Sequence, residues 1–368
     1  MNWTHTSCAQ QIRFGRGVIG DVLSVVKGLR GQRALLITTR GRRESPAGRR
    51  LVESLGPTLA SVFDGARPHV PMTAVHAATQ QVRRDAIDCI VSFGGGSCSD
   101  LGKAVCYFIE KEAGTLGTSY FDRPTLPHVS IPTGYSGAEL TAFFGMTDEA
   151  TRQKSGAGGP TITPAAVLYD PEATLDLPAD VSAETGMNAL AHCVEAAWSP
   201  TRTPEADAIA LRGAALIYRW LPVVVEHPSD IEARSEMLVG AMLAGRCLQN
   251  ASMGVHHGLS QLVGGRTGIA HGLTNALILA HAVRFNADAV PDVISRLAAA
   301  FGRTDRDAAA AIDELRARLG LPARLSACGL QKEDIDVIVK QSPANANIGK
   351  NPKPVSERDA RAILEAAF

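Results

Sequence analysis

The sequence lacks several features that would place it in a common class of protein. It has no G-x-x-x-x-G-K-[ST] motif, and its 37 basic residues balance its 37 acidic residues, so a nucleic-acid-binding surface is not indicated. No apolar run approaches ~18 residues, the length that a membrane-spanning helix needs. With 45% hydrophobic and 20% charged residues in a chain of 368, the composition predicts a globular protein of two domains, with no nucleic-acid and no membrane partner.

Cysteine is also scarce and shows no pattern. The seven cysteines form no C-x-x-C pair, and Cys89, Cys106 and Cys193 lie in apolar patterns typical of small core residues. The first eight residues lack the basic and then apolar build of a secretory signal peptide. These observations predict a reduced protein in the cytoplasm.

The most informative segment, residues 88–103, joins an apolar strand to a helix through three consecutive glycines. Gly94, Gly95 and Gly96 are followed by Ser97 and Asp100. Glycines at such a junction let the backbone approach a phosphate closely, and the amides at the start of the helix stabilise its charge. The loop differs from the G-x-G-x-x-G spacing but predicts the same function, which is binding of a nucleotide diphosphate.

The two halves of the chain have different hydrophobic periods. Strands are expected at 33–39, 88–93 and 127–133, with helices at 47–55 and 74–84 and a basic turn at 40–43; this alternation predicts a parallel sheet with helices on both faces. From about Thr185 the period is helical, with segments at 188–197, 207–218, 231–248, 273–285, 291–300, 307–319, 333–340 and 360–368. We therefore predict an α/β nucleotide-binding domain over 1–170 and an all-helical domain over 171–368, with the boundary in the turn-rich link 169–178.

Histidines gather in the second half. Asn188 and His192 are four residues apart on one helix face, and His257 and His271 follow on either side of a Gly-rich bend at 264–268. Three histidines that reach one point from helix ends are typical of a divalent metal site.

These motifs resemble those of the iron-containing alcohol dehydrogenase superfamily, which has a dehydroquinate synthase-like fold. Its metal is held in the pattern D-A-x-x-H … H-x-x-x-H-x-x-G … H-G, so any metal here would lie on Asn188, His192, His257 and His271. Asn188 replaces the aspartate, and Gln261 replaces the second histidine of H-x-x-x-H. Because an amide is a poorer ligand for a dication than a carboxylate, this replacement weakens any metal site.

Asn at this position resembles the maleylacetate reductase branch of the superfamily, which works without a metal, so the resemblance implies that no metal is required. Residues 132–139, 253–257 and 351–354 resemble its P-T-T-Y-A-G-S-E, M-G-L-H-H and N-P-R-P segments, whereas Gly258 replaces its usual lysine. The resemblance implies a homodimer that reduces maleylacetate, or a similar anionic substrate, to 3-oxoadipate in aromatic degradation.

The same resemblance implies the site residues. NADH or NADPH would be held by Thr39, Gly94, Gly95, Gly96, Ser97, Asp100, Thr133 and Thr141. The candidates for binding the carboxylates or supplying a proton are Tyr135, Lys154, His192, Arg246, His257 and His271, with Arg266 as a further cation.

Arg40, Arg42 and Arg43 follow the strand that usually selects the cofactor, with no carboxylate before Glu44. We therefore expect NADPH to be accepted. Three alternatives stay open: a metal-dependent (Fe or Zn) alcohol dehydrogenase or aldehyde reductase, a dehydroquinate synthase-like lyase, and a non-catalytic nucleotide-binding relative.

Overall fold

The computed structural model describes residues 8–151 and 153–368, and the chain divides into two compact units between Leu177 and Pro178. The division falls inside the turn-rich link of the sequence analysis. Residues 8–177 form what we call the α/β unit, and residues 178–368 form the helical unit.

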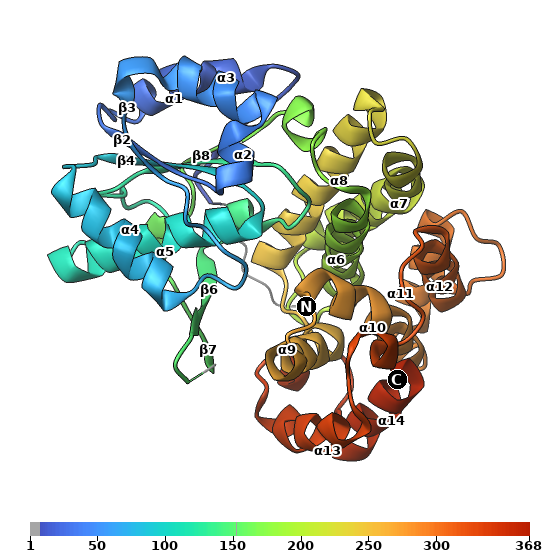
Figure 1. The fold of residues 1–368 in the computed structure, drawn as a ribbon. Coiled ribbons are helices and arrows are strands. Elements are labelled where there is room, and N and C mark those ends of the chain that lie inside the picture. Colours follow the sequence, from blue (N-terminus) through green and yellow to red (C-terminus); the bar gives the residue numbers. More distant parts are fainter. Residues whose placement is uncertain (1–7, 152) are drawn as a thin grey trace. The chain divides into compact units, whose positions relative to one another are not determined.

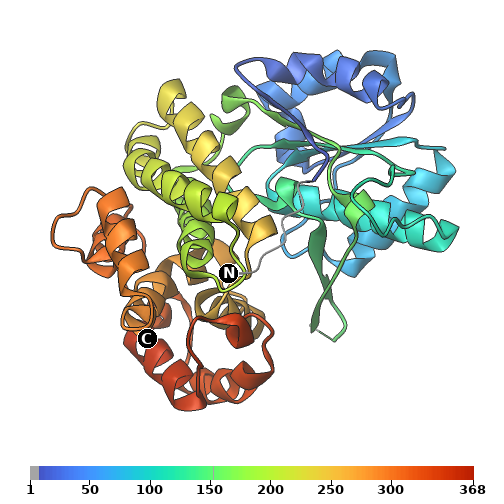
Figure 2. The ribbon, with the colours of Figure 1, turned by 180° about the vertical axis from the view of Figure 1, so that it is seen from behind.

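The α/β unit is built on a six-stranded parallel sheet of order β1-β8-β5-β4-β2-β3 (Figure 1). Its strands are β1 (Gln11–Phe14), β2 (Ala34–Ile37), β3 (Leu59–Phe63), β4 (Cys89–Gly94), β5 (His128–Pro132) and β8 (Ala166–Tyr169). An antiparallel hairpin of β6 (Phe143–Asp148) and β7 (Gln153–Gly158) extends away from the sheet of this unit (Figure 2).

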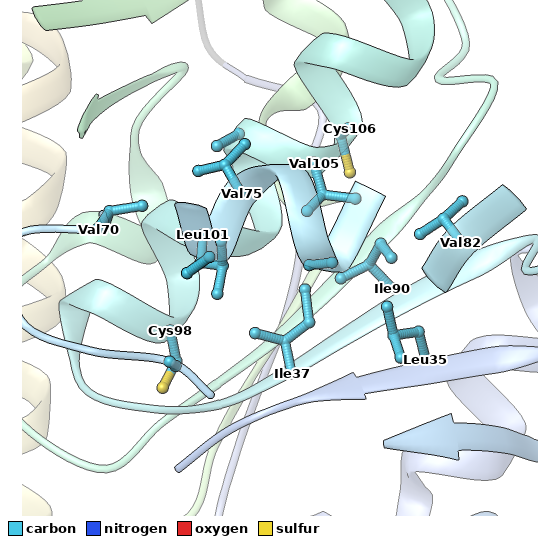
Figure 3. Close-up of a cluster of buried hydrophobic side chains, with 14 of the residues drawn as sticks. Leu35, Ile37, Val70, Val75, Val82, Ile90, Cys98, Leu101, Val105 and Cys106 are labelled. Carbon is cyan, nitrogen blue, oxygen red and sulfur yellow. The ribbon is translucent and has the colours of Figure 1, made fainter. Parts of the chain in front are cut away.

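Helices cover both faces of this sheet, because its central strands are apolar on both sides. Leu35 and Ile37 of β2 and Ile90 of β4 point towards Leu101 and Val105 of α5 (Figure 3). The alternate strand residues form a second core on the opposite face. The helices of this unit are α1 (Val22–Gly28), α2 (Arg40–Glu44), α3 (Pro46–Leu55), α4 (Met72–Arg84) and α5 (Gly96–Ala113).

The helical unit contains nine helices among its described residues. They are α6 (Ala179–Trp198), α7 (Pro204–Glu226), α8 (Ile231–Asn250), α9 (Val255–Thr267), α10 (His271–Asn286), α11 (Pro291–Ala300), α12 (Ala308–Arg318), α13 (Lys332–Gln341) and α14 (Glu357–Ala367). The predicted fold class, an α/β domain followed by an all-helical domain, is confirmed.

Two local predictions were wrong. The basic segment at 40–43 is not a turn but the helix α2, whose first turn is capped by the Thr39 hydroxyl. The expected bend at 264–268 is the last turn of α9, which ends at Gly268 with a left-handed φ of 76°.

Helix α7 is long and apolar enough to cross a membrane by length and composition, with a mean hydropathy of 1.5. Inspection for uninterrupted apolar runs missed it because Arg212 and Arg219 divide the sequence. A core helix passes the same test, and α7 packs against both α6 and α8. The helix is therefore weak evidence for a membrane.

Candidate active site

The predicted cofactor residues of the α/β unit lie where the strand order of the sheet reverses. The chain leaves β2 towards β3 on one side, whereas β4 leads to β5 on the other. In open parallel sheets, ligands bind outside the carboxyl ends of the strands at this point. The Thr38 hydroxyl joins the two strand ends by donating to the Phe93 carbonyl at 2.7 Å.

The glycine loop lies directly on this edge. Gly94 has φ 152°, a conformation that side chains rarely adopt, and a Cβ there would overlap Cys98 Sγ. Gly95 is exposed, and a Cβ on it would meet no protein atom within 4 Å. The amides of Gly96 and Ser97 belong to the first turn of α5, where N–H groups have no partner within the helix. The loop therefore fits a pyrophosphate.

Thr39, Thr133 and Thr141 lie around the same strand ends in different roles. Thr39 caps α2, accepting a hydrogen bond from the Arg42 amide. Thr133 is buried beside the glycine loop, where its amide donates to the Gly94 carbonyl at 2.9 Å and its hydroxyl has no partner among the described residues. The hydroxyl of Thr141 accepts a hydrogen bond from Lys103 Nζ at 2.7 Å, so this threonine helps to hold the lysine in place.

Lys103 is a buried cation that the sequence analysis did not single out. Its ammonium donates to the carbonyls of Ala138 and Phe143 at 2.7 and 2.5 Å, and it pairs with Asp100 at 2.8 Å. Lys103 thus holds α5 against Ala138 and the first residue of β6, and Asp100, predicted to position the cofactor, pairs with this lysine within the helix. In the sequence, this ion pair is indicated by the i,i+3 spacing of Asp100 and Lys103 in an otherwise buried helix.

The other predicted residues of the α/β unit differ in burial. Tyr135 is fully buried in the loop after β5. Lys154 lies exposed on the hairpin strand β7. Glu139, the acid of the 132–139 segment, is buried and accepts a hydrogen bond from the Tyr169 hydroxyl at 2.6 Å, so it braces the fold.

A second glycine motif escaped the sequence analysis. Gly15, Gly17 and Gly20 have the G-x-G-x-x-G spacing and follow β1. However, β1 is an edge strand away from the reversal point, and the amide of Ile19 in this turn donates to the carboxylate of Asp170 at 3.3 Å. This turn is therefore held by the protein's own carboxylate.

In the helical unit, the predicted histidines come together. His192 projects from α6, His257 from the first turn of α9 and His271 from the start of α10. The rings of His192 and His257 are stacked with centroids 4.8 Å apart, and the His271 ring lies 6.1 Å from that of His257. His192, His257 and His271 therefore lie close together, as the sequence analysis predicted.

A polar network surrounds the cluster. Asn188 Oδ1 accepts a hydrogen bond from Asn275 Nδ2 at 2.7 Å, and His256 Nε2 lies 2.9 Å from the Asn275 carbonyl. Glu195, fully buried on α6, lies 2.6 Å from His257 Nδ1. None of Glu195, His256 and Asn275 was predicted to belong to the site.

Burial sets the charge of these groups. It lowers the pKa of His192 well below its usual value, and the imidazoles of His257 and His271 lower it further. Burial also lowers the pKa of His257, against the opposing effect of Glu195. For Glu195, burial acts to raise the pKa, but the adjacent His256 and His257 side chains outweigh it and hold the pKa well below its usual value. His192 and His257 are thus neutral imidazoles beside one carboxylate.

The four candidate metal ligands lack the carboxylate of the family's metal pattern. They offer three imidazoles and the Asn188 amide, whose oxygen already accepts a hydrogen bond, and no carboxylate. Glu195, His256 and His257 do place ligand atoms within 4.8 Å of one another. However, Glu195 accepts hydrogen bonds from backbone amides and lies against His257 Nδ1, which also faces His256 Nδ1, so these three groups are engaged with one another.

The cationic candidates of this unit, Arg246 and Arg266, make other contacts in the described part of the chain. Arg246 is half-buried on α8, where its carbonyl accepts from Asn250, and Arg266 pairs with Asp334 at 2.7 Å. Arg266 is therefore committed to an ion pair at the surface.

Gly258 and Gln261, the two residues of α9 that depart from the branch pattern, both lie against the segment 345–350. A Cβ at Gly258 would overlap Ile348, so the segment 345–350 packs where a side chain would stand. Gln261 accepts a hydrogen bond from Asn347 of the same segment at 3.1 Å. Both changes therefore accommodate this segment on α9.

Comparison with known proteins gives consistent matches over the whole chain. The family model described as iron-containing alcohol dehydrogenase matches residues 9–171, and that for the C-terminal part of the Fe-containing alcohol dehydrogenase family matches residues 182–368. The maleylacetate reductase of Rhizobium sp. strain MTP-10005 is 35% identical, over 100% of this chain and 97% of that protein.

Two solved structures extend the comparison. The maleylacetate reductase from Agrobacterium tumefaciens is 32% identical with a TM-score of 0.89, over 100% of this chain and 98% of that one. The sulfoacetaldehyde reductase from Bifidobacterium kashiwanohense, solved in complex with NAD+, is 26% identical with a TM-score of 0.91, over 100% of this chain and 99% of that one.

Proposed function

Because this chain belongs to the iron-containing alcohol dehydrogenase family, within its maleylacetate reductase branch, we propose that it reduces maleylacetate to 3-oxoadipate with NADH or NADPH. The enzyme is an oxidoreductase. The observation that carries the metal-free form of this proposal is the Asn188–Asn275 hydrogen bond, which places an amide where a metal site would need a carboxylate.

The residues of each unit support a distinct part of the reaction. Gly94, Gly95 and the amides of α5 hold the pyrophosphate, with the Thr133 hydroxyl beside them. The bound nicotinamide supplies a hydride, and the other carbon of the substrate double bond takes a proton. His192, His257 and His271 provide buried nitrogen atoms that bind the anionic substrate or carry that proton, with Tyr135, Lys154 and Arg246 as further candidates.

We also propose a homodimer in the cytoplasm. All seven cysteines lie in the described ranges and are free thiols, which favours a reducing compartment.

Turnover of maleylacetate is expected to survive removal of metal. The purified protein would be assayed for NADH oxidation before and after exhaustive chelation, with its metal content measured in parallel. Loss of activity with the metal would replace this proposal by the metal-dependent alcohol dehydrogenase hypothesis. Binding of NADH without turnover would indicate a different substrate or a non-catalytic protein.

Asn188→Asp is the matched variant for this assay. An aspartate retains the hydrogen bond from Asn275 and adds the missing charge, so this variant is expected to bind Fe²⁺ or Zn²⁺ at least about tenfold more tightly than the wild type. Equal metal affinities in the two proteins would show that Asn188 is not the cause of metal independence.

NADPH is expected to have a Michaelis constant within about tenfold of that of NADH. Arg40 and Arg43 pair with Glu44 and Asp64, but the pairs are exposed and worth about 1 kcal/mol or less, so a phosphate can compete for them. Arg40→Ala is expected to raise the constant for NADPH about tenfold while that for NADH, the internal control, stays unchanged. Strict use of NADH would contradict this expectation.

A further inference from the structure

Glu195 is a buried carboxylate between the two helices that carry the histidines. It lies on α6 three residues after His192, and its side chain is fully buried. A carboxylate in such a position needs partners for both oxygens.

Every contact of Glu195 in the described part of the chain is a hydrogen-bond donor or a histidine ring. Oε1 accepts from the amides of Gly254 and His256 at 3.0 and 3.1 Å. Oε2 accepts from the amide of His257 at 3.2 Å and lies 2.6 Å from His257 Nδ1. Three backbone N–H groups thus point at the two oxygens, an environment that favours an ionised carboxylate. Glu195 therefore caps the start of α9 as an ionised carboxylate.

This arrangement determines where the ring protons lie. A carboxylate oxygen at 2.6 Å requires a proton on His257 Nδ1. His256 Nε2 faces the Asn275 carbonyl, which can only accept, so His256 carries its proton on Nε2 and leaves Nδ1 bare. That bare atom lies 3.2 Å from His257 Nδ1 and also accepts from it. Both neighbours of Nδ1 thus select one tautomer of His257.

The remaining nitrogen of His257 is the atom left for chemistry. Nε2 is buried without a hydrogen-bond partner among the described residues, on the ring that stacks against His192. We propose that Glu195 is a positioning residue, which fixes His257 in the Nδ1–H tautomer so that Nε2 is available to accept a hydrogen bond or proton. The catalytic use of Nε2 rests on the reductase function proposed above, but the tautomer does not.

The first test is the imidazole ¹⁵N–¹H NMR spectrum of the wild-type protein, with His257 assigned by the loss of its signals in His257→Asn. A proton on Nδ1 and none on Nε2 is expected. A proton on Nε2 in the neutral ring would overturn the proposal, whatever the behaviour of any variant.

The Glu195→Gln variant tests the cause. In this variant the amide oxygen takes the place of Oε1 and still accepts from the backbone amides of Gly254 and His256. The NH₂ group takes the place of Oε2 and faces His257 Nδ1, which can accept a hydrogen bond from it if the ring proton moves to Nε2. The tautomer is therefore expected to switch, and kcat to fall by on the order of 10²–10⁴ with little change in the Michaelis constant for NADH, as expected when an imidazole is held in the wrong tautomer. An unchanged tautomer and kcat would overturn the proposal.

Two further variants separate positioning from general destabilisation. Glu110→Gln changes an equally buried carboxylate that accepts from the Thr125 amide and the Thr161 hydroxyl, and it is expected to leave the His257 tautomer unchanged. Glu195→Asp retains an acceptor and is expected to restore the wild-type tautomer and part of kcat. If the tautomer is as stated but maleylacetate is not turned over by the wild type, the proposed function fails and the role of Glu195 stands.

Discussion

Lys103→Met is expected to lower the free energy of unfolding of the α/β unit by about 3 kcal/mol. Removing one partner of a buried ion pair costs about 3–5 kcal/mol, and the lower end applies because the Asp100 side chain is 24% exposed and can gain some hydration. The loss of the ammonium also leaves two carbonyls and the Thr141 hydroxyl without their donor. The measurement is the free energy of opening of α5 by amide hydrogen exchange, since a chain of two units need not unfold in one step.

Lys27→Met is the matched control for this variant. Lys27 is exposed in the last turn of α1, so its replacement is expected to change the same free energy by less than about 1 kcal/mol. A loss below that level for Lys103→Met would mean that the buried ammonium contributes nothing net to stability.

Gly95→Ala is expected to weaken NADH binding at least about tenfold without lowering stability. The position has a φ of −75°, and a Cβ there meets no protein atom within 4 Å, so the free protein accepts alanine. A pyrophosphate lying against the loop would meet that Cβ, and a loss of ~1.4 kcal/mol of binding free energy is a factor of ten. Calorimetric titration with NADH and a thermal melt of the same sample measure the two effects.

Gly94→Ala and Gly28→Ala complete the comparison. Gly94→Ala is expected to lower both stability and affinity, because of its φ of 152° and the overlap with Cys98. Gly28, at the exposed end of α1, has open space around it, and its replacement is expected to change neither property adversely. Unaltered affinity in Gly95→Ala would place the phosphates elsewhere.

The α/β unit could be predicted where single segments carry a complete pattern. Strand β4, the three glycines and the start of α5 are contiguous, so the local sequence defines the turn and the helix terminus. Strands β1 and β3 were missed, because QIRF and LASVF are short and only partly buried, with no alternation that marks a strand. Helix α9 was missed because Gly264 and Gly265 weaken helix propensity, which packing against α10 and α13 overrides.

The histidines of the site were predicted by motif, and their partners were not. Considered alone, a glutamate in a helical segment, such as Glu195, is expected to be exposed to solvent. The informative signal is its context, since residues 186–198 are apolar or small apart from Asn188, His192 and Glu195 itself, and a carboxylate inside such a helix must have buried partners. The identity of those partners, the amides at the start of α9, lies about 60 positions away and cannot be inferred from local pattern.

The strand order also has a consequence for the order of events during synthesis. Strand β1 is the first to leave the ribosome, yet its only neighbour in the sheet is β8, where Gln11 is opposite Ala166. At a synthesis rate of about 5–20 residues per second, β1 has no partner strand for roughly 8–30 s. The sheet is then completed just before α6 emerges at Ala179, so the α/β unit can be assembled before the first histidine of the cluster has left the ribosome.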